Sequence, residues 1–95
     1  MPEMRMSVRW PDGVQDSCYS PSRVLKDYFQ VGQSYEVADF RDLSRSALTV
    51  ASERVREKFG SPCSRAADQL ACIEERCRAF AAVPGARVLV EAFHE

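Results

Sequence analysis

Residues 4–20 read "MRMSVRWPDGVQDSCYS", and this stretch predicts a β-hairpin at the start of the chain. Apolar residues occupy every second position at Met4, Met6, Val8 and Trp10, with charged or small polar residues between them. A period of two with one apolar face is typical of a half-buried strand. The Pro-Asp-Gly sequence at 11–13 predicts a turn, because proline fixes φ and glycine tolerates a positive φ. A second strand, about residues 14–19, is therefore expected to pair back onto the first.

Two long amphipathic patterns follow. Over residues 39–59, with Asp39 as the expected N-cap, apolar residues recur at every fourth position, which predicts a long helix ended by Gly60. A further helix is expected from about Ser61-Pro62 to about Ala82, where Pro-Gly ends the pattern.

Shorter elements are expected between and after these patterns. Ser20-Pro21 predicts the start of a short helix that runs to about Phe29, because serine is a good N-cap and proline a good first helical residue. Residues 34–37 suit a short strand, and the Val- and Leu-rich residues 86–93 predict a strand that returns to the hairpin. The expected order β-β-α-(β)-α-α-β is an α+β, two-layer domain. In it, a small antiparallel sheet of the hairpin and the C-terminal strand is covered by three helices.

The composition is that of one globular domain over residues 1–95. Hydrophobic residues make up 45% and charged residues 28% of the chain, which are ordinary values. The 13 basic and 14 acidic residues leave a net charge of −1, which argues against a nucleic-acid-binding protein, because such proteins carry a basic excess. No stretch approaches the roughly 18 apolar residues of a membrane span, and the start lacks the apolar core of a signal peptide. A cytoplasmic location is expected.

The four cysteines are expected to be reduced thiols, because nothing indicates export. Cys18 and Cys63 each stand beside a Ser-Pro pair, and a helix N-terminus with a nearby Arg23 or Arg65 would favour the thiolate. A cysteine nucleophile also needs a base, and the single histidine is His94, near the end of the chain. Cysteine is in addition a common small buried residue. Both interpretations stay open here, and the structural one is favoured.

The same two Ser-Pro pairs are candidates for an anion or ligand site. Its residues would be Ser20 and Arg23 at one predicted helix start, and Ser61 and Arg65 at the other. Free backbone N–H groups at a helix start bind anions, although solvated caps would give the same pattern. No Cys and His residues stand at the spacing of a metal site, and no glycine-rich phosphate loop is present. No metal, no cofactor and no catalytic residue is assigned.

Three short motifs occur in a specific order: "RWPDG" at 9–13, "CYSPS" at 18–22 and "ASERVR" at 51–56. With them, the chain resembles a small bacterial protein family named for the nitrogen starvation response, over residues 1 to about 75. The resemblance implies a gene cluster that also encodes a nitrilase-like carbon–nitrogen hydrolase, a radical-SAM protein, an acetyltransferase, a flavoprotein and a synthase-like protein. Such clusters are linked to the use of nitrile or cyanide nitrogen. The resemblance implies an accessory role in nitrogen scavenging and supplies no catalytic residues.

These observations favour a small cytoplasmic accessory or binding protein of the nitrogen starvation response without catalysis of its own. It would dock on a protein partner from the nitrogen-scavenging gene cluster or bind a small anionic metabolite. The alternative is a cysteine-dependent enzyme or thiol carrier, in which Cys18 or Cys63 attacks a nitrile-type or other electrophilic carbon. A DNA-linked regulator is a weaker third hypothesis. An edge strand and amphipathic helices are also compatible with a homodimer.

Overall fold

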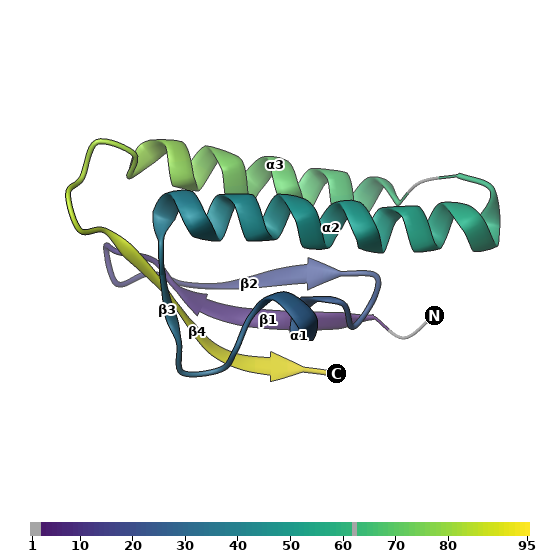
Figure 1. Cartoon of the computed structure of the whole chain (residues 1–95), viewed down its shortest axis with the longest axis horizontal. Coiled ribbons are helices and arrows are strands. Elements are labelled where there is room, and N and C mark those ends of the chain that lie inside the picture. Colours follow the sequence, from purple (N-terminus) through teal and green to yellow (C-terminus); the bar gives the residue numbers. More distant parts are fainter. Residues whose placement is uncertain (1–2, 62) are drawn as a thin grey trace.

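The computed structural model describes residues 3–61 and 63–95, and in these ranges a layer of helices covers one face of a four-stranded sheet (Figure 1). The elements are β1 (Met4–Arg9), β2 (Gln15–Ser20), α1 (Leu25–Tyr28), β3 (Ser34–Glu36), α2 (Val37–Phe59), α3 (Ser64–Ala79) and β4 (Arg87–His94). Their order confirms the predicted α+β fold, including the N-terminal hairpin, the short third strand and the returning C-terminal strand.

The sheet has the order β2-β1-β4-β3, and all neighbouring strands are antiparallel. The register between β1 and β4 shifts between Ser7 and Val8, so that Glu91 is the extra residue of a bulge. The Glu91 carboxylate accepts hydrogen bonds from Gln15 (2.9 Å) and Arg9 (3.1 Å), and these bonds lower its pKa. The bulge therefore links the three longest strands on the sheet face that the helices leave open.

The core lies between the sheet and the two long helices. The alternation predicted for β1 is confirmed, because Met4, Met6 and Val8 are all buried, as is Trp10, which directly follows the strand. The Trp10 ring meets Phe40 of α2 edge-on at 5.5 Å and stacks on Phe80, which follows α3, at 6.3 Å. One aromatic cluster thus joins the end of β1, the first turns of α2 and the end of α3.

The predicted start of the short helix at Ser20-Pro21 is wrong. Ser20 is still the last paired residue of β2, opposite Met4, and α1 begins only at Leu25. The Ser20 hydroxyl donates to the Ser22 carbonyl (2.6 Å) and accepts from the Ser22 N–H (3.2 Å), which makes a corner rather than a helix cap. Strand pairing across the sheet therefore overrides the local Ser-Pro signal.

The two long helices also differ from prediction at their ends. The N-cap of α2 is Glu36, so Asp39 lies inside the first turn, where its charge still favours the helix dipole. Gly60 ends α2 with φ of 84°, as predicted. Cys63 is the N-cap of α3, so the helix begins later than the predicted start at Ser61-Pro62. Pro62 itself lies outside the described residues. The C-cap of α3 is Phe80, just short of the predicted end.

The helical hairpin of α2 and α3 extends past one end of the sheet (Figure 1). The 23 residues of α2 span about 35 Å at 1.5 Å per residue, whereas a six-residue strand spans about 20 Å. The molecule is accordingly elongated, at 41 × 22 × 18 Å. Nowhere in the described ranges does a helix combine the length and the apolar character needed to cross a membrane.

Candidate functional site

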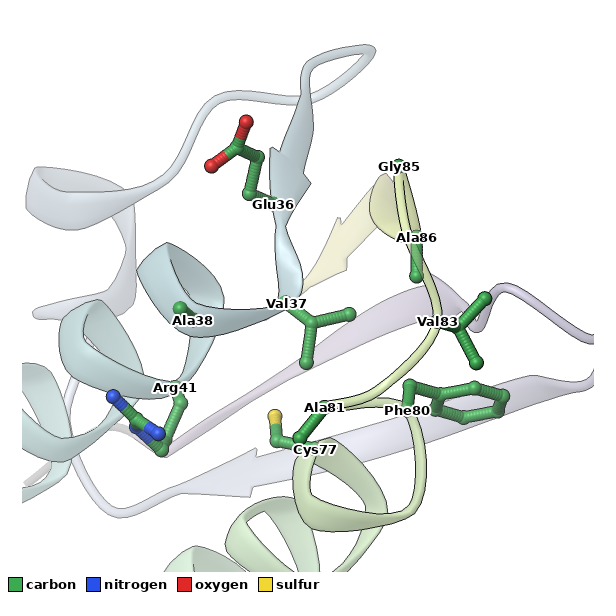
Figure 2. A pocket seen from close by; sticks show the side chains of 10 residues that line it. All are labelled: Glu36, Val37, Ala38, Arg41, Cys77, Phe80, Ala81, Val83, Gly85 and Ala86. Atoms are coloured by element: carbon green, nitrogen blue, oxygen red, sulfur yellow. The ribbon is translucent and has the colours of Figure 1, made fainter.

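A pocket of about 420 Å³ lies where the start of α2, the end of α3 and the loop into β4 meet (Figure 2). Apolar side chains and polar atoms both line it, and the apolar side chains include Val37 from α2, Phe80 at the end of α3, and Val83 from the loop. Figure 2 shows the Val37 side chain directed toward Ala81 and Cys77 across the pocket. Three elements that are distant in the sequence therefore build one concave site.

The loop between α3 and β4 is held by its own hydrogen bonds. The Val83 N–H donates to the Phe80 carbonyl (3.0 Å), and the Ala86 N–H donates to the Val83 carbonyl (3.3 Å). The Val37 N–H then donates to the Ala86 carbonyl (3.3 Å), which attaches the first residue of α2 to the start of β4. These bonds fix the pocket walls and leave Val83 half exposed, at 50%, at the pocket's edge.

The charged and titratable groups of the pocket come from both helices and from β3. Burial raises the pKa of the Cys77 thiol to about 11, although the positive charge of Arg41 acts in the opposite direction. The thiol is therefore protonated near neutral pH. Arg41 is held by Asp42, whose carboxylate lies 3.1 Å from its Nε. Glu36, the acidic residue of the lining, lies 3.9 Å from Arg87.

Cys18, the first candidate thiol, faces the core. It lies on β2 opposite Met6 and is 1% exposed, and α1 begins seven residues later. Burial, assisted by the charge of Asp16, raises the pKa of Cys18 to about 12. This environment stabilises the neutral thiol, which is the opposite of what a cysteine nucleophile needs.

The structure separates Ser20 from Arg23. Ser20 is fully buried inside the corner that follows β2, and Nη1 of Arg54 reaches that corner from α2 by donating to the Ser22 hydroxyl (3.0 Å). Arg23 is exposed and pairs with Glu95 at 3.2 Å, beyond the end of β4. The first predicted anion site is thus divided between a buried corner and the C-terminal end of the sheet.

The residues of the second candidate site lie at the start of α3. Ser61 is exposed, and Cys63 is half-buried at the N-cap. The Arg65 guanidinium lies 3.9 Å from the centre of the Tyr19 ring, and burial is the main cause that raises the pKa of Tyr19. Arg65 therefore fastens α3 to β2.

Two features of the molecule were not predicted from the sequence. One is the pocket. Its one sign in the sequence is Arg41, a charged residue that lies one helical turn after Val37 on the same side of α2. The other is His94, which belongs to β4 and places its Nε2 2.9 Å from the Ser7 hydroxyl. Among the described residues, no group of three His, Cys, Asp or Glu side chains is arranged to bind a metal ion.

Comparison with known proteins gives one match. The family model described as nitrogen starvation-induced protein NitG matches residues 5–93. No curated protein and no solved structure gave a significant match. The matched range reaches from β1 into β4, so it extends well beyond residue 75, where the predicted resemblance ended, and contains the whole pocket. The chain therefore belongs to the NitG family of nitrogen starvation-induced proteins.

Proposed function

We propose that this protein is a small, non-catalytic binding protein of the nitrogen starvation response, and that the pocket between the start of α2, the end of α3 and the α3–β4 loop is its ligand site. The observation that carries the proposal is the pocket itself. Its volume of about 420 Å³ falls within the range of about 300–1,000 Å³ that is usual for small-molecule sites. Apolar side chains with a few charged groups are also typical of such sites. The family assignment supplies the physiological setting.

The side chains of the pocket suit binding better than chemistry. With a pKa of about 11, the Cys77 thiol is almost entirely protonated at neutral pH and is a poor nucleophile. An arginine guanidinium such as that of Arg41 is suited to hold an anion through paired hydrogen bonds. A binding role uses both residues as they stand in the structure.

The test is to identify what the protein carries in nitrogen-starved cells. Tagged protein would be purified from such cells under native conditions and denatured, and the released small molecules would be measured by mass spectrometry. The matched variants are Ala81→Trp, which fills the pocket, and Ala82→Trp, which changes the next residue, outside the lining. Both alanines are exposed, so both variants are expected to fold.

We expect one compound to be enriched with the wild type and with Ala82→Trp, and to fall at least tenfold with Ala81→Trp. Equal recovery with Ala81→Trp, or no enriched compound from starved cells, would overturn the ligand-binding proposal.

We further propose that the protein acts in the cytoplasm by docking on a partner protein of the same response. The observation that favours docking is Phe59, which is 65% exposed at the end of α2, on the hairpin that projects past the sheet. Exposed aromatic residues are frequent anchors of protein interfaces.

A pull-down from nitrogen-starved cells tests the docking proposal. Phe59→Ser should lose a partner that the wild type recovers, whereas Val14→Ser, at a 51% exposed valine in the hairpin turn, should keep it. If both variants recover the same proteins, Phe59 is not part of the docking surface. Recovery of no nitrogen-scavenging protein by the wild type would refute docking altogether.

A further inference from the structure

We infer that the ligand of this pocket is a small organic acid, whose carboxylate binds Arg41 and whose apolar body lies against Val37, Phe80 and Val83. The inference rests on the proposed function, because it names the chemical class that the same pocket takes. It is carried by a lining that combines one arginine with apolar side chains, which matches a molecule that is charged at one end and apolar at the other.

Arg41 has hydrogen-bond donors to spare. It lies one helical turn after Val37, and both line the pocket (Figure 2). One oxygen of Asp42 lies 3.1 Å from both Nε and Nη2 of Arg41, which orients the guanidinium. An arginine carries five N–H donors in a planar fork, and an exposed pair with a neighbouring carboxylate is weak. A ligand carboxylate can therefore bind the remaining donors in a bidentate manner.

The charge of Arg41 acts inside the pocket. Arg41 lowers the pKa of the Cys77 thiol at the pocket base, although burial outweighs this effect. The opposing charge in the lining, Glu36, lies near Arg87 on the sheet and is drawn on the β3 side of the pocket, away from Arg41 (Figure 2). The lining therefore holds its cationic and its acidic group on different sides, and an anion would bind on the Arg41 side.

The rest of the lining selects an apolar body. Phe80 is fixed by stacking on Trp10, and Val37 is buried at the first turn of α2, so both surfaces are in place before a ligand arrives. Val83, half exposed at the edge, gains burial when a ligand enters. A short aliphatic or aromatic acid satisfies both halves of the site.

The inference is tested by titration of the ¹⁵N-labelled protein with three probes of one length: sodium hexanoate, 1-hexanol and hexylammonium chloride. The amide signals of residues 37–41 and 80–86 report on the pocket. We expect saturable shifts with hexanoate, and binding at least tenfold weaker with the alcohol and the amine. Arg41→Gln should reduce hexanoate affinity at least tenfold and leave hexanol affinity unchanged.

The matched control is Arg45→Gln. Arg45 lies one turn further along α2 and pairs with Glu74 of α3 at 2.7 Å, outside the pocket lining. This variant should bind hexanoate like the wild type, and its spectrum provides a fold reference for Arg41→Gln.

The outcomes separate this inference from the proposed function. If all three probes bind alike, or if starved cells yield a neutral compound or an amine, the pocket is a ligand site but the organic-acid inference is wrong. If no probe shifts the pocket amides and starved cells yield no compound, both fail. An organic acid recovered from starved cells that shifts the same amides and requires Arg41 would establish both.

Discussion

Two corners of this molecule share a cysteine and a Ser-Pro pair but differ in structure. The first, "CYSPS" at 18–22, and the second, "SPCSR" at 61–65, each combine a cysteine with a Ser-Pro pair. In the first corner Cys18 faces the core and the helix starts late. In the second corner Cys63 is the N-cap of a 16-residue helix. Local sequence proposes a helix start in both, but strand pairing through Ser20 takes precedence in the first. A helix therefore starts close to its local Ser-Pro signal only where the chain has already left the sheet.

The largest difference between the corners should appear in thiol reactivity. At pH 8 in the folded protein, iodoacetamide should label Cys18 more than 100-fold more slowly than the exposed Cys72, because Cys18 is buried and has a pKa of about 12. Cys63, half-buried, should fall between them. Mass spectrometry of each labelled cysteine over time gives the rates, and labelling in urea is the control. The comparison fails if Cys18 and Cys72 react alike in the folded state. Faster labelling of Cys63 than of Cys72 would favour the thiol-enzyme alternative.

The next largest difference should appear in stability. Cys18→Ser places a hydroxyl in the core opposite Met6 and should lower the free energy of unfolding by about 1–3 kcal/mol. Cys63→Ser supplies a better N-cap residue at a half-buried position and should change it by less than about 0.5 kcal/mol, or raise it. Urea unfolding followed by circular dichroism measures both. Equal losses for the two variants would mean that the corners are buried alike.

The pH dependence of stability provides a third contrast. The pKa of Cys18 is raised from 9.0 to about 12, so the folded state keeps a proton that the unfolded state releases. Stability from this thiol is therefore complete below pH 9 and is lost as the pH rises from 9 toward 12, by at most about 1.4 kcal/mol per pH unit. Cys77 contributes with the same sign. Unfolding in urea at pH 8 and pH 10 should show a smaller decrease for Cys18→Ala than for the wild type, and Cys63→Ala should behave like the wild type. A decrease as large for Cys18→Ala as for the wild type would refute this assignment.

The smallest expected effect concerns a contact between the first corner and α3. Gln69 of α3 accepts a hydrogen bond from the Tyr19 N–H (2.9 Å), and Asp16 accepts one from the Ser17 N–H (2.9 Å), so side chains occupy donors of the edge strand β2. Gln69→Ala should cost about 1 kcal/mol and favour self-association through β2. Urea unfolding and analytical ultracentrifugation test this, with Ala67→Gly as a control for destabilisation of α3. If only the control associates, the edge is not what Gln69 protects. The homodimer that the sequence left open would then have to use another surface.

Much of this fold can be predicted from the periodicity of apolar residues. The parts that cannot be predicted in this way all have the same physical cause. The alternating apolar residues of β1 predict a strand, and the apolar residues four apart in α2 and α3 predict helices. Each pattern is set by the face of the element that must be buried. The late start of α1 depends on Ser20 pairing with Met4, and the bulge depends on the register between β1 and β4. Both are contacts between strands, which no local window of sequence contains.

The candidate site was harder to predict than the fold. The predicted residues were chosen for chemistry next to one another in the sequence, yet Ser20 and Arg23 are held apart by the corner and the C-terminal pair. The pocket instead joins Val37 to Val83 and Phe80, and this proximity depends on how the α3–β4 loop returns to the start of α2. Arg41 by itself gives the pattern of an ordinary solvated helix position.

The position of β4 has a consequence for how the chain is made. β4 is synthesised after the other six described elements, yet it lies between β1 and β3, and the contact of Ser7 with His94 spans 87 residues. Pairing across so long a separation is slow to form, because the whole intervening chain must close as a loop. Until β4 emerges, the edge of β1 that faces away from β2 stays open. Folding of the sheet is therefore expected to wait for β4, and a nascent chain stalled before β4 would present this open edge of β1 to chaperones.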